Sequence, residues 1–517
     1  MQLLVAPQSN SGSTKKLDGA KVSGSVTVLA QAAQGVDAAR FYVDDPSQSG
    51  KPAFTATSAP FAMKLDTTRL PDGSHAVTVN VDETDGQSVQ ATSRFVVANQ
   101  SGSGGGSTGG GSTGGGSTGG GSTGYRPIPA ATLYVDPSAG SDSNSGRSAS
   151  QAFKTVQHAA DVVQPGDVVY LRGGVYPIQE RFTRSGTSSA PIVWTSYPGE
   201  WAIFDGSDQS RGVSTERVWV DGASWNVFMN FEVRNSPQDG IYVRNSNDNI
   251  FSNIWTHGNN YCGIANVQSS RNRYEYIVAY DNFDQVNPSG RIGDDADGIG
   301  LNSGDSNVIY HSLVFNNSDD GVDTWQSTHT LVDHVISHDN GRGPYGNGNG
   351  IKAGGGNATV NTVVRDSIAF DNRGAGFTDN SGLIIHFYND TSFNNGTYAF
   401  MGGATTVFRN DLAFQGGPVG LWGSDSANNS WDLGISDPKF VSTDPASPDF
   451  LSLQSGSPAI GAGTDVGLPY SGSAPDLGAL PYSSTYASLI APITVPLNQL
   501  TATAPSGAPT ASALASR

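Results

Sequence analysis

Cysteine is almost absent from this chain, since Cys262 is the only one among 517 residues. A lone cysteine cannot close an internal disulfide, so packing and hydrogen bonds must hold the fold together. We expect Cys262 to fill a small apolar position. No apolar run approaches the roughly 18 residues needed to cross a bilayer, so we expect no membrane-spanning helix. The apolar run at residues 3–6 is also far too short for a signal peptide.

Positive charge is scarce as well. The chain has 28 Lys and Arg against 46 Asp and Glu, which gives a net charge of −18. Such an acidic surface repels phosphate backbones and anionic lipids, which argues against nucleic acid or an anionic membrane as a partner. An acidic substrate would need local positive charge, from a metal ion or from individual Arg and Lys side chains. Charged residues make up only 14% while glycine numbers 66, a composition typical of extended β structure with many turns.

A run of glycine, serine and threonine divides the chain. Within residues 100–124 the pentad Gly-Gly-Gly-Ser-Thr occurs four times, which predicts a flexible linker between two domains. Residues 1–17 form a short segment before the first domain. Residues 486–517 are rich in Ala, Thr, Ser and Pro, so we expect a disordered tail.

Residues 18–99 show the alternation of apolar and polar residues that is typical of short β-strands, for example along 77–81. About 80 residues of this kind predict a small β-sandwich. The segment resembles the immunoglobulin-like (Ig-like) modules of bacterial secreted proteins, especially at 41–45 and 70–79. It has no cluster of aromatic or acidic residues, so we interpret it as a spacer or a stabilising module.

The second domain, which starts near Tyr125, opens with an amphipathic helix within 152–167, followed by a strand at 168–176. One face of this helix is apolar: Val156, Ala159, Ala160 and Val163. A helix in this place is typical of the cap that covers the first coil of a solenoid, whose stacking surface would otherwise be exposed.

Beyond this cap the chain repeats. A glycine followed by an apolar residue recurs at spacings of 23, 35, 23, 29 and 26 residues: Gly240-Ile241, Gly263-Ile264, Gly298-Ile299, Gly321-Val322, Gly350-Ile351 and Gly376-Phe377. A period near 23 residues, rich in β-branched, Asn and Gly residues, predicts a parallel β solenoid over 125–485. The longer spacings indicate loop insertions at 283–296 and 341–348. Such insertions often collect on one face of a solenoid and build a groove there.

The Gly–apolar pair can serve as a ruler, because it marks the same phase in each coil. Asp297, Asp320 and Asn349 each stand immediately before that glycine, and Asp323 and Lys352 each follow it by two positions. Neighbouring strands lie about 4.8 Å apart. The acids of these coils should therefore gather in one small patch, with Lys352 one coil away from Asp323.

With Asp319, which precedes Asp320, the patch would hold four carboxylates. Carboxylates this close repel one another unless a cation lies among them. Ca²⁺ suits such a cluster because it accepts six to eight oxygen ligands in flexible geometry. No Cys or His adjoins the patch in sequence, which argues against zinc. The alternative is that Asp before Gly merely forms a turn, which explains Asp239-Gly240 well but three acids within 319–323 less well.

Lysine is missing from most of the second domain, where Lys352 is the only one between Lys154 and Lys439. An isolated lysine is usually a surface residue, but beside an acid cluster it can act as a base when a nearby cation or burial lowers its pKa. The glycines within 346–356 would let a polymer approach the backbone closely. Three further residues are candidate substrate-binding groups: Arg342, Asn349 and Arg373. The two arginines are equally well explained as solvated coil residues.

Three segments, ADGIG (296–300), NSDDGVDTW (317–325) and GNGIKAGG (348–355), resemble in order the signature segments of family 9 polysaccharide lyases, the pectate lyase L type. The resemblance implies an all-β chain whose second domain is a right-handed parallel β-helix, preceded by the Ig-like β-sandwich. It also implies a secreted, Ca²⁺-dependent lyase that cleaves an acidic, uronate-containing polysaccharide by β-elimination. The resemblance implies that Ca²⁺ is held by Asp297, Asp319, Asp320 and Asp323. It also implies that Lys352 is the Brønsted base.

Pectate is the expected substrate, and a monomer is the expected state. Rhamnogalacturonan, alginate or a bacterial exopolysaccharide are alternative substrates. A β-helix glycoside hydrolase is a second alternative, but the Gly-His-Gly and Arg-Ile-Lys segments typical of polygalacturonases are absent from the sequence. A non-catalytic glycan-binding adhesin is a third, and the acid cluster beside a lone lysine argues against it.

Overall fold

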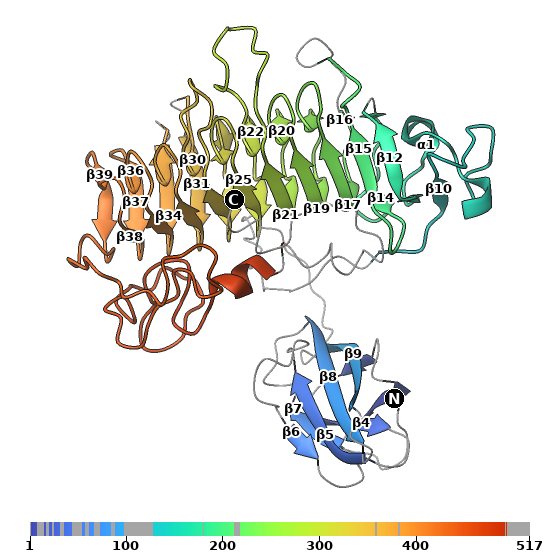
Figure 1. Cartoon of the computed structure of the whole chain (residues 1–517), viewed down its shortest axis with the longest axis horizontal. Coiled ribbons are helices and arrows are strands. Elements are labelled where there is room, and N and C mark those ends of the chain that lie inside the picture. The colour runs from blue at the N-terminus through green and yellow to red at the C-terminus, as the bar shows by residue number, and fades with distance from the viewer. Residues whose placement is uncertain are drawn as a thin grey trace, which may run out of the picture. The chain divides into compact units, whose positions relative to one another are not determined.

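The computed structural model describes the strands between residues 2 and 97, and residues 128–493 apart from 179, 211–217, 357–358, 381–382 and 492. The chain divides into two compact units, 1–124 and 125–517 (Figure 1). The linker expected at 100–124 and the part of the expected tail beyond 493 lie outside the described residues.

The first unit is a β-sandwich of two sheets, with the strand orders β2-β1-β4-β7 and β3-β9-β8-β5-β6. The strands are β1 (Gln2–Pro7), β2 (Lys15–Lys16), β3 (Ala20–Val22), β4 (Ser25–Gln31), β5 (Val36–Val43), β6 (Phe54–Ala56), β7 (Ala62–Asp66), β8 (Gly73–Glu83) and β9 (Ser88–Val97). Phe41, Val77 and Val79 are fully buried, as the alternation predicts. Strand β1 pairs with β4, so residues 2–7 belong to the sandwich rather than to a separate leading segment.

A short helix, α1 (Val156–Val162), caps the first coils of the second unit, after a 3-10 turn at Ala149–Gln151. Thr155 is the N-cap of α1, and its side chain accepts a hydrogen bond from a backbone N–H of the first turn. The predicted apolar face is buried in the core: Val156, Ala159, Ala160 and Val163. The cap predicted from the sequence is therefore present, although the helix is shorter than the segment 152–167.

Two long parallel sheets form the walls of the second unit (Figure 1). The larger has 19 strands: β10 (Leu133–Val135), β11 (Val168–Leu171), β12 (Gly174–Pro177), β14 (Ile192–Ser196), β15 (Ala202–Asp205), β17 (Asn226–Arg234), β19 (Ile250–His257), β21 (Arg273–Tyr280), β24 (Val308–Tyr310), β25 (Leu313–Phe315), β28 (Leu331–Asp333), β29 (Ile336–His338), β31 (Thr359–Arg365), β32 (Ile368–Phe370), β34 (Leu383–Tyr388), β35 (Thr391–Phe393), β37 (Thr406–Arg409), β38 (Leu412–Phe414) and β40 (Asp425–Ala427). The smaller has 10: β13 (Arg181–Phe182), β16 (Val218–Asp221), β18 (Ile241–Arg244), β20 (Ile264–Val267), β22 (Ile299–Asn302), β26 (Val322–Asp323), β30 (Ile351–Ala353), β33 (Phe377–Asp379), β36 (Phe400–Gly402) and β39 (Gly420–Leu421). A separate pair joins β23 (Gly304–Asp305) to β27 (Ser327–Thr328).

The Gly–apolar repeat marks the same place in six successive coils of the smaller sheet. Its apolar residues pair from strand to strand in this order: Ile241, Ile264, Ile299, Val322, Ile351 and Phe377. Phe377 pairs in turn with Phe400, which follows an alanine. All of them have 0% exposure, so they form a continuous stack inside the solenoid. The register predicted from the sequence repeat is confirmed.

A ladder of asparagines explains the glycine before the apolar residue in these six coils. Buried Asn side chains hydrogen-bond from coil to coil at 2.8–3.0 Å: Asn259, Asn282, Asn317, Asn340, Asn372 and Asn395. At Gly321 an added Cβ would lie 2.8 Å from the amide nitrogen of Asn340 and 2.6 Å from the carbonyl oxygen of Gly350. The glycine therefore leaves room for the ladder and for the next coil.

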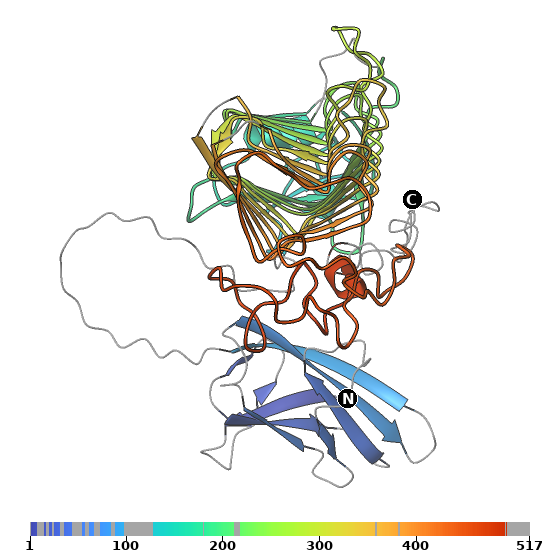
Figure 2. The same ribbon diagram turned by 90° about the vertical axis from the view of Figure 1, so that its left-hand side faces the viewer.

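The C-terminal segment runs along the outside of the larger sheet, as the view down the coils in Figure 2 shows. Tyr486, Leu489, Ile490 and Ile493 are buried against this sheet, and residues 486–491 are helical. The expected disorder from residue 486 onward therefore does not hold for 486–491 and 493. The composition of the segment suggested disorder, but the physical cause of its packing is the spacing of these four residues, which form one apolar helical face.

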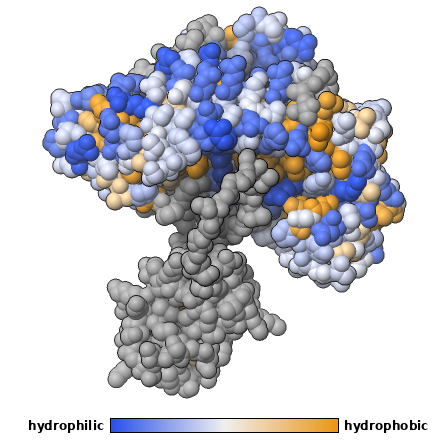
Figure 3. Space-filling model, turned by 180° about the vertical axis from the view of Figure 1, so that it is seen from behind, coloured by the Kyte–Doolittle hydropathy of each residue, from blue (hydrophilic) through white to orange (hydrophobic). Residues whose placement is uncertain are grey.

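On the face drawn in Figure 3, the surface of the described residues is mainly hydrophilic, with separate apolar patches. A few large aromatic side chains of the second unit are nevertheless well exposed, among them Trp325, Tyr345 and Trp422. Within the described part of the chain, no helix is both long enough and apolar enough to cross a membrane.

Candidate active site

The Gly–apolar repeat predicts correctly where the candidate residues lie along the smaller sheet. Val322 pairs with Ile351 and Asp323 pairs with Lys352 across β26 and β30. Because successive side chains of a strand point to opposite faces, and Val322 and Ile351 point into the core, Asp323 and Lys352 project from the outer face. The predicted stacking of Lys352 one coil from Asp323 is confirmed.

The lysine contacts two of the four acids directly. Lys352 Nζ lies 2.8 Å from Asp320 Oδ2 and 2.7 Å from Asp323 Oδ2. Asp297 accepts a hydrogen bond from the backbone N–H of Asp320 at 3.1 Å. Ligand oxygens of Asp297, Asp319 and Asp320 all lie within 4.8 Å of one another. The four predicted acids and the lysine thus form one compact cluster.

The acids are strained electrostatically. Burial raises the pKa of Asp297 well above its ordinary value, and repulsion from Asp319 adds to the effect. Burial and repulsion from Asp320 raise the pKa of Asp319 to about 8. Burial also raises the pKa of Asp323, to about 6, although the neighbouring ammonium group works against it. One lysine therefore does not neutralise this cluster.

The pKa of Lys352 is raised as well, which for an amine favours the charged form. Burial alone would lower the pKa of Lys352, but the carboxylates of Asp320 and Asp323 outweigh it and raise that pKa above its ordinary value. In the protein without a bound ion, the amine is therefore an ammonium group. A base role requires another cation to take over these carboxylates.

The cluster fits a hard cation. Asp323 Oδ1 is buried and has no hydrogen-bond partner, which leaves an anionic oxygen with unused acceptor capacity. The donors are carboxylate oxygens, the ligands that Ca²⁺ prefers. Cys262 Sγ lies 3.8 Å from Asp297 Oδ2, but burial raises the pKa of its thiol and keeps it protonated. A thiol in that form is a poor zinc ligand.

Cys262 had been missed by the sequence reasoning, although a signal for it exists. It stands immediately before Gly263 and therefore has the same phase in its coil as Asp297 and Asp320. Its thiol lies beside Asp297 and 3.3 Å from the carbonyl oxygen of Asp295. The small apolar role expected for this residue is compatible with its burial, but its neighbour is the acid cluster.

The three candidate substrate-binding residues are engaged in contacts within the protein. Asn349 donates to Asp320 Oδ1 through its backbone at 2.6 Å and through its side chain at 3.0 Å, so it holds this carboxylate in place. Arg373 donates to the carbonyl oxygens of Gly343 and Gly346. Arg342 forms an ion pair with Asp281 at 2.9 Å. A role of these three in substrate binding stays a prediction.

The two loop insertions meet beside the acid cluster. An added Cβ at Gly293, in the first insertion, would collide with Gly343 in the second. The guanidinium group of Arg291 lies 5.5 Å from the ring centre of Tyr345, again joining the two loops. The backbone N–H of Asn347 donates to Asp319, so the second loop also orients a member of the cluster.

The glycines after Lys352 serve a different purpose from the one expected. Gly355 has a φ of +131° and an added Cβ there would lie 2.5 Å from the ring of Trp325. At Gly356 the same atom would lie 2.5 Å from the side-chain nitrogen of Gln326. At these two positions the space is filled by side chains of the preceding coil, so it is not open to a polymer. Trp325, which is 38% exposed, borders the site and had been missed.

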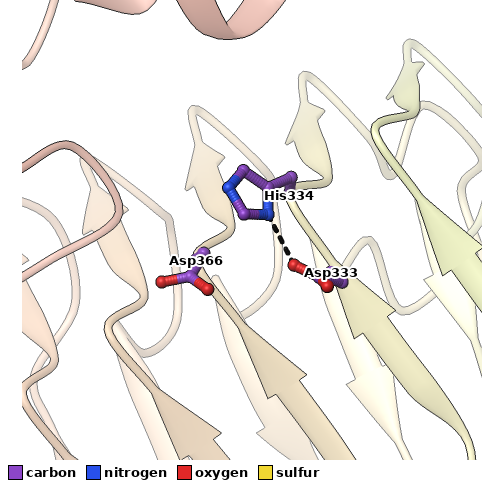
Figure 4. Close-up of side chains that lie close together, drawn as sticks. All are labelled: Asp333, His334 and Asp366. Atoms are coloured by element: carbon purple, nitrogen blue, oxygen red, sulfur yellow. Dashed lines mark hydrogen bonds and ion pairs between the residues drawn. The ribbon is translucent and has the colours of Figure 1, made fainter. Parts of the chain in front are cut away.

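A second group of possible metal ligands lies in the larger sheet: Asp333, His334 and Asp366 (Figure 4). The imidazole Nδ1 lies 2.5 Å from Asp333 Oδ1, and Arg365 pairs with the other oxygen of Asp333 at 2.6 Å. Asn389 donates to Asp366 at 2.9 Å. Because a guanidinium group already balances these acids, this group is better explained as an ion-pair network. The cluster around Lys352 is the stronger candidate site.

Comparison with known proteins gives the family of both units. Residues 133–410 match the family described as Pel9A-like, right handed beta helix region, and residues 14–79 match the bacterial Ig domain family. Pectate lyase PEL9 of Emericella nidulans is 31% identical over 369 residues, which cover 61% of this chain and 87% of that protein. Pectate lyase L of Dickeya dadantii is 32% identical over 388 residues, which cover 67% of this chain and 89% of that protein.

Two solved structures share the architecture. The crystal structure of pectate lyase Pel9A aligns with a TM-score of 0.61 at 29% identity, over 68% of this chain and 96% of that one. A rhamnogalacturonan lyase aligns with a TM-score of 0.54 at 25% identity, over 63% of this chain and 97% of that one. The chain therefore belongs to the Pel9A-like family of right-handed parallel β-helix polysaccharide lyases, and it carries a bacterial Ig domain ahead of the β-helix.

Proposed function

We propose that this polysaccharide lyase cleaves pectate by Ca²⁺-dependent β-elimination, with Lys352 as the base. The observation that carries the proposal is the Lys352 ammonium group, held within 2.8 Å of Asp320 and Asp323 in a cluster of four acids. The two relatives at 31% and 32% identity are both pectate lyases, which supports pectate as the substrate.

The ion would be held by the four clustered acids: Asp297, Asp319, Asp320 and Asp323. Bound there, Ca²⁺ supplies positive charge that neutralises a uronate carboxylate and makes the adjacent C5 proton more acidic. The protein fixes the ligands in advance, because Asn349 orients Asp320 and the backbone of Asn347 orients Asp319. Such preorganisation avoids reorientation during the reaction.

Lys352 Nζ takes the C5 proton. With the carboxylates of Asp320 and Asp323 neutralised, burial becomes the dominant influence on Lys352, and burial lowers the pKa of a lysine. The electron pair of the C5–H bond forms the C4–C5 double bond as the C4–O bond breaks, and the departing oxygen takes a proton from water. The products are a new reducing end and a 4,5-unsaturated uronate at the new non-reducing end.

The test is to incubate the full chain with polygalacturonate and Ca²⁺ and to follow the ultraviolet absorbance of the unsaturated uronate. We expect absorbance and reducing ends to increase together. New reducing ends without absorbance would identify a hydrolase instead. Binding of the polymer without any new reducing ends would identify an adhesin.

Rhamnogalacturonan is the second candidate substrate, because a rhamnogalacturonan lyase shares the fold at a TM-score of 0.54. The insertions 283–296 and 341–348 border the site and could alter its subsites. Initial rates on polygalacturonate, rhamnogalacturonan and alginate distinguish these substrates. We expect the highest rate on polygalacturonate, and a higher rate on either other polymer would replace it.

An extracellular location accompanies this proposal, since the substrate is a large extracellular polymer. We propose further that the Ig-like unit is a spacer or stabilising module, joined to the lyase by the Gly-, Ser- and Thr-rich segment 100–124. Neither a bound glycan nor a bound metal is needed for such a role.

A further inference from the structure

Trp422 is the most exposed large apolar side chain in the part of the chain that the structure describes. Its exposed fraction is 57%, and it follows directly after β39, the last strand of the smaller sheet. Burying an aromatic side chain of this size against a ligand is favourable. An aromatic ring left this open, on the sheet that carries the acid cluster, is therefore a candidate contact for a ligand.

The ring is held in place by its neighbours. Tyr398 contacts Trp422 edge to face, with ring centres 5.6 Å apart and an interplanar angle of 74°. An added Cβ at Gly420 would lie 2.7 Å from Trp422 Cη2 and 3.1 Å from Tyr398 Cε1. The absence of a side chain at Gly420 thus lets the indole lie over the strand. The result is a fixed aromatic platform rather than a freely rotating side chain.

The platform is in line with the lysine. Lys352 pairs with Thr378, Thr378 pairs with Met401, and Met401 pairs with Gly420 along the smaller sheet. Three strand steps of about 4.8 Å separate Lys352 from Gly420 by about 14 Å. All four residues occupy the same outward-facing register position. A chain laid across the strands from Lys352 would therefore reach the indole of Trp422.

We propose that Trp422, backed by Tyr398, is a distal sugar-binding platform for the same acidic polysaccharide that is cut beside Lys352. This inference rests on the proposed function and extends it to several sugar units on one side of the cleaved bond. The apolar C–H face of a pyranose ring packs on the indole, while the carboxylates point away into water. The platform needs no charge of its own, because it binds the ring and not the carboxylate.

The kinetic test compares the full chain with Trp422→Ala and Trp422→Phe on polygalacturonate and on trigalacturonate. We expect Trp422→Ala to raise KM for the polymer about tenfold, the effect of losing about 1.4 kcal/mol of binding. The kcat on the polymer and both constants on the trimer should stay unchanged, and Trp422→Phe should restore part of the loss. Tyr470→Ala is the matched control, since Tyr470 is 45% exposed on the C-terminal segment. Equal KM changes on polymer and trimer would overturn the inference.

A binding test separates failure of this inference from failure of the proposed function. Equilibrium binding of polygalacturonate to the full chain, in the presence of Ca²⁺, is compared with and without Trp422→Ala. Weaker binding by the variant supports the platform even if no lyase activity is found, in which case only the proposed function fails. Unchanged binding overturns the platform and leaves the lyase proposal standing.

Discussion

At the scale of single residues, the site combines one lysine with more acids than it can neutralise. Lys352 pairs with Asp320 and Asp323, while the pKa of Asp297 and of Asp319 is still raised by burial and repulsion. Such a cluster stores unfavourable charge that a divalent cation relieves. Under the proposed function, an ion bound here would also release Lys352 from its carboxylate partners, which would link ion binding to the base role.

We expect Lys352→Ala to lower kcat on polygalacturonate by about 10²–10⁴-fold, the usual contribution of a general base. Lys352→Arg should be nearly as inactive, because a guanidinium group keeps its proton. The measurement is the initial rate of absorbance at saturating substrate and Ca²⁺. Circular dichroism of each variant controls for folding, and a Lys352→Arg enzyme with half the original rate would reject the base assignment.

We expect EDTA to abolish turnover and added Ca²⁺ to restore it. Asp323→Asn should then raise the Ca²⁺ concentration for half-maximal activity by about tenfold, because affinity follows the number of charged ligands. Titration of activity against free Ca²⁺ measures this shift. Asp444→Asn, a change at an exposed position of the C-terminal segment, is the control. Full activity in excess EDTA would contradict the metal role.

At the scale of elements, polar ladders inside the coils fix the register that builds the site. Most ladder positions are Asn, whose amide both donates and accepts, but one ladder contains Asp390 and Asp411. Both are fully buried, and Oδ2 of each has no hydrogen-bond partner. Burial raises the pKa of both carboxyl groups well above the ordinary value. Burial in such a position favours the protonated form of an acid.

We expect Asp411→Asn to stabilise the β-helix in alkaline buffer by about 1–3 kcal/mol, the usual cost of a buried unsatisfied group. A raised folded-state pKa means that the stability contributed by Asp411 is present at low pH and is lost as pH rises through that pKa. The gain from the variant should therefore grow with pH. Thermal unfolding in acidic and in alkaline buffer measures it, and an equal effect in both would contradict the explanation.

The repeat of the strands also decides which site residues could be predicted from the sequence. The Gly–apolar repeat placed Asp297, Asp320, Asp323 and Lys352 correctly, because one residue per coil stacks in a fixed phase. It missed Trp325, whose place beside the site depends on how its ring packs over Gly355 in the next coil. Contacts of this kind depend on side-chain conformations that a repeat does not specify.

At the scale of the whole molecule, the chain consists of two units with separate cores. The second unit carries the acid cluster, the lysine and the aromatic platform, and its core extends from the cap helix to the last coils. The C-terminal segment completes it by covering apolar residues on the outer side of the larger sheet.

We expect residues 125–517 alone to retain the kcat and KM of the full chain on soluble polygalacturonate. The reason is that every residue assigned to catalysis, to the ion and to the platform lies in this unit. Kinetics of the shortened chain beside the full chain measure this. A marked rise in KM on removal of residues 1–124 would show that the Ig-like unit itself takes part in substrate binding.

The sequence by itself determined the order of the two units, the repeat of the coils and the alignment of four acids with one lysine. These follow from periodicity, because stacked coils bring residues of equal phase together. Only the tertiary structure decided that Lys352 pairs as an ammonium group with Asp320 and Asp323, and that Asn349 and Arg373 hold neighbouring parts of the site. It also decided that the helix from residue 486 packs against the larger sheet. Those outcomes depend on burial and on contacts between distant segments, which no local pattern in the chain records.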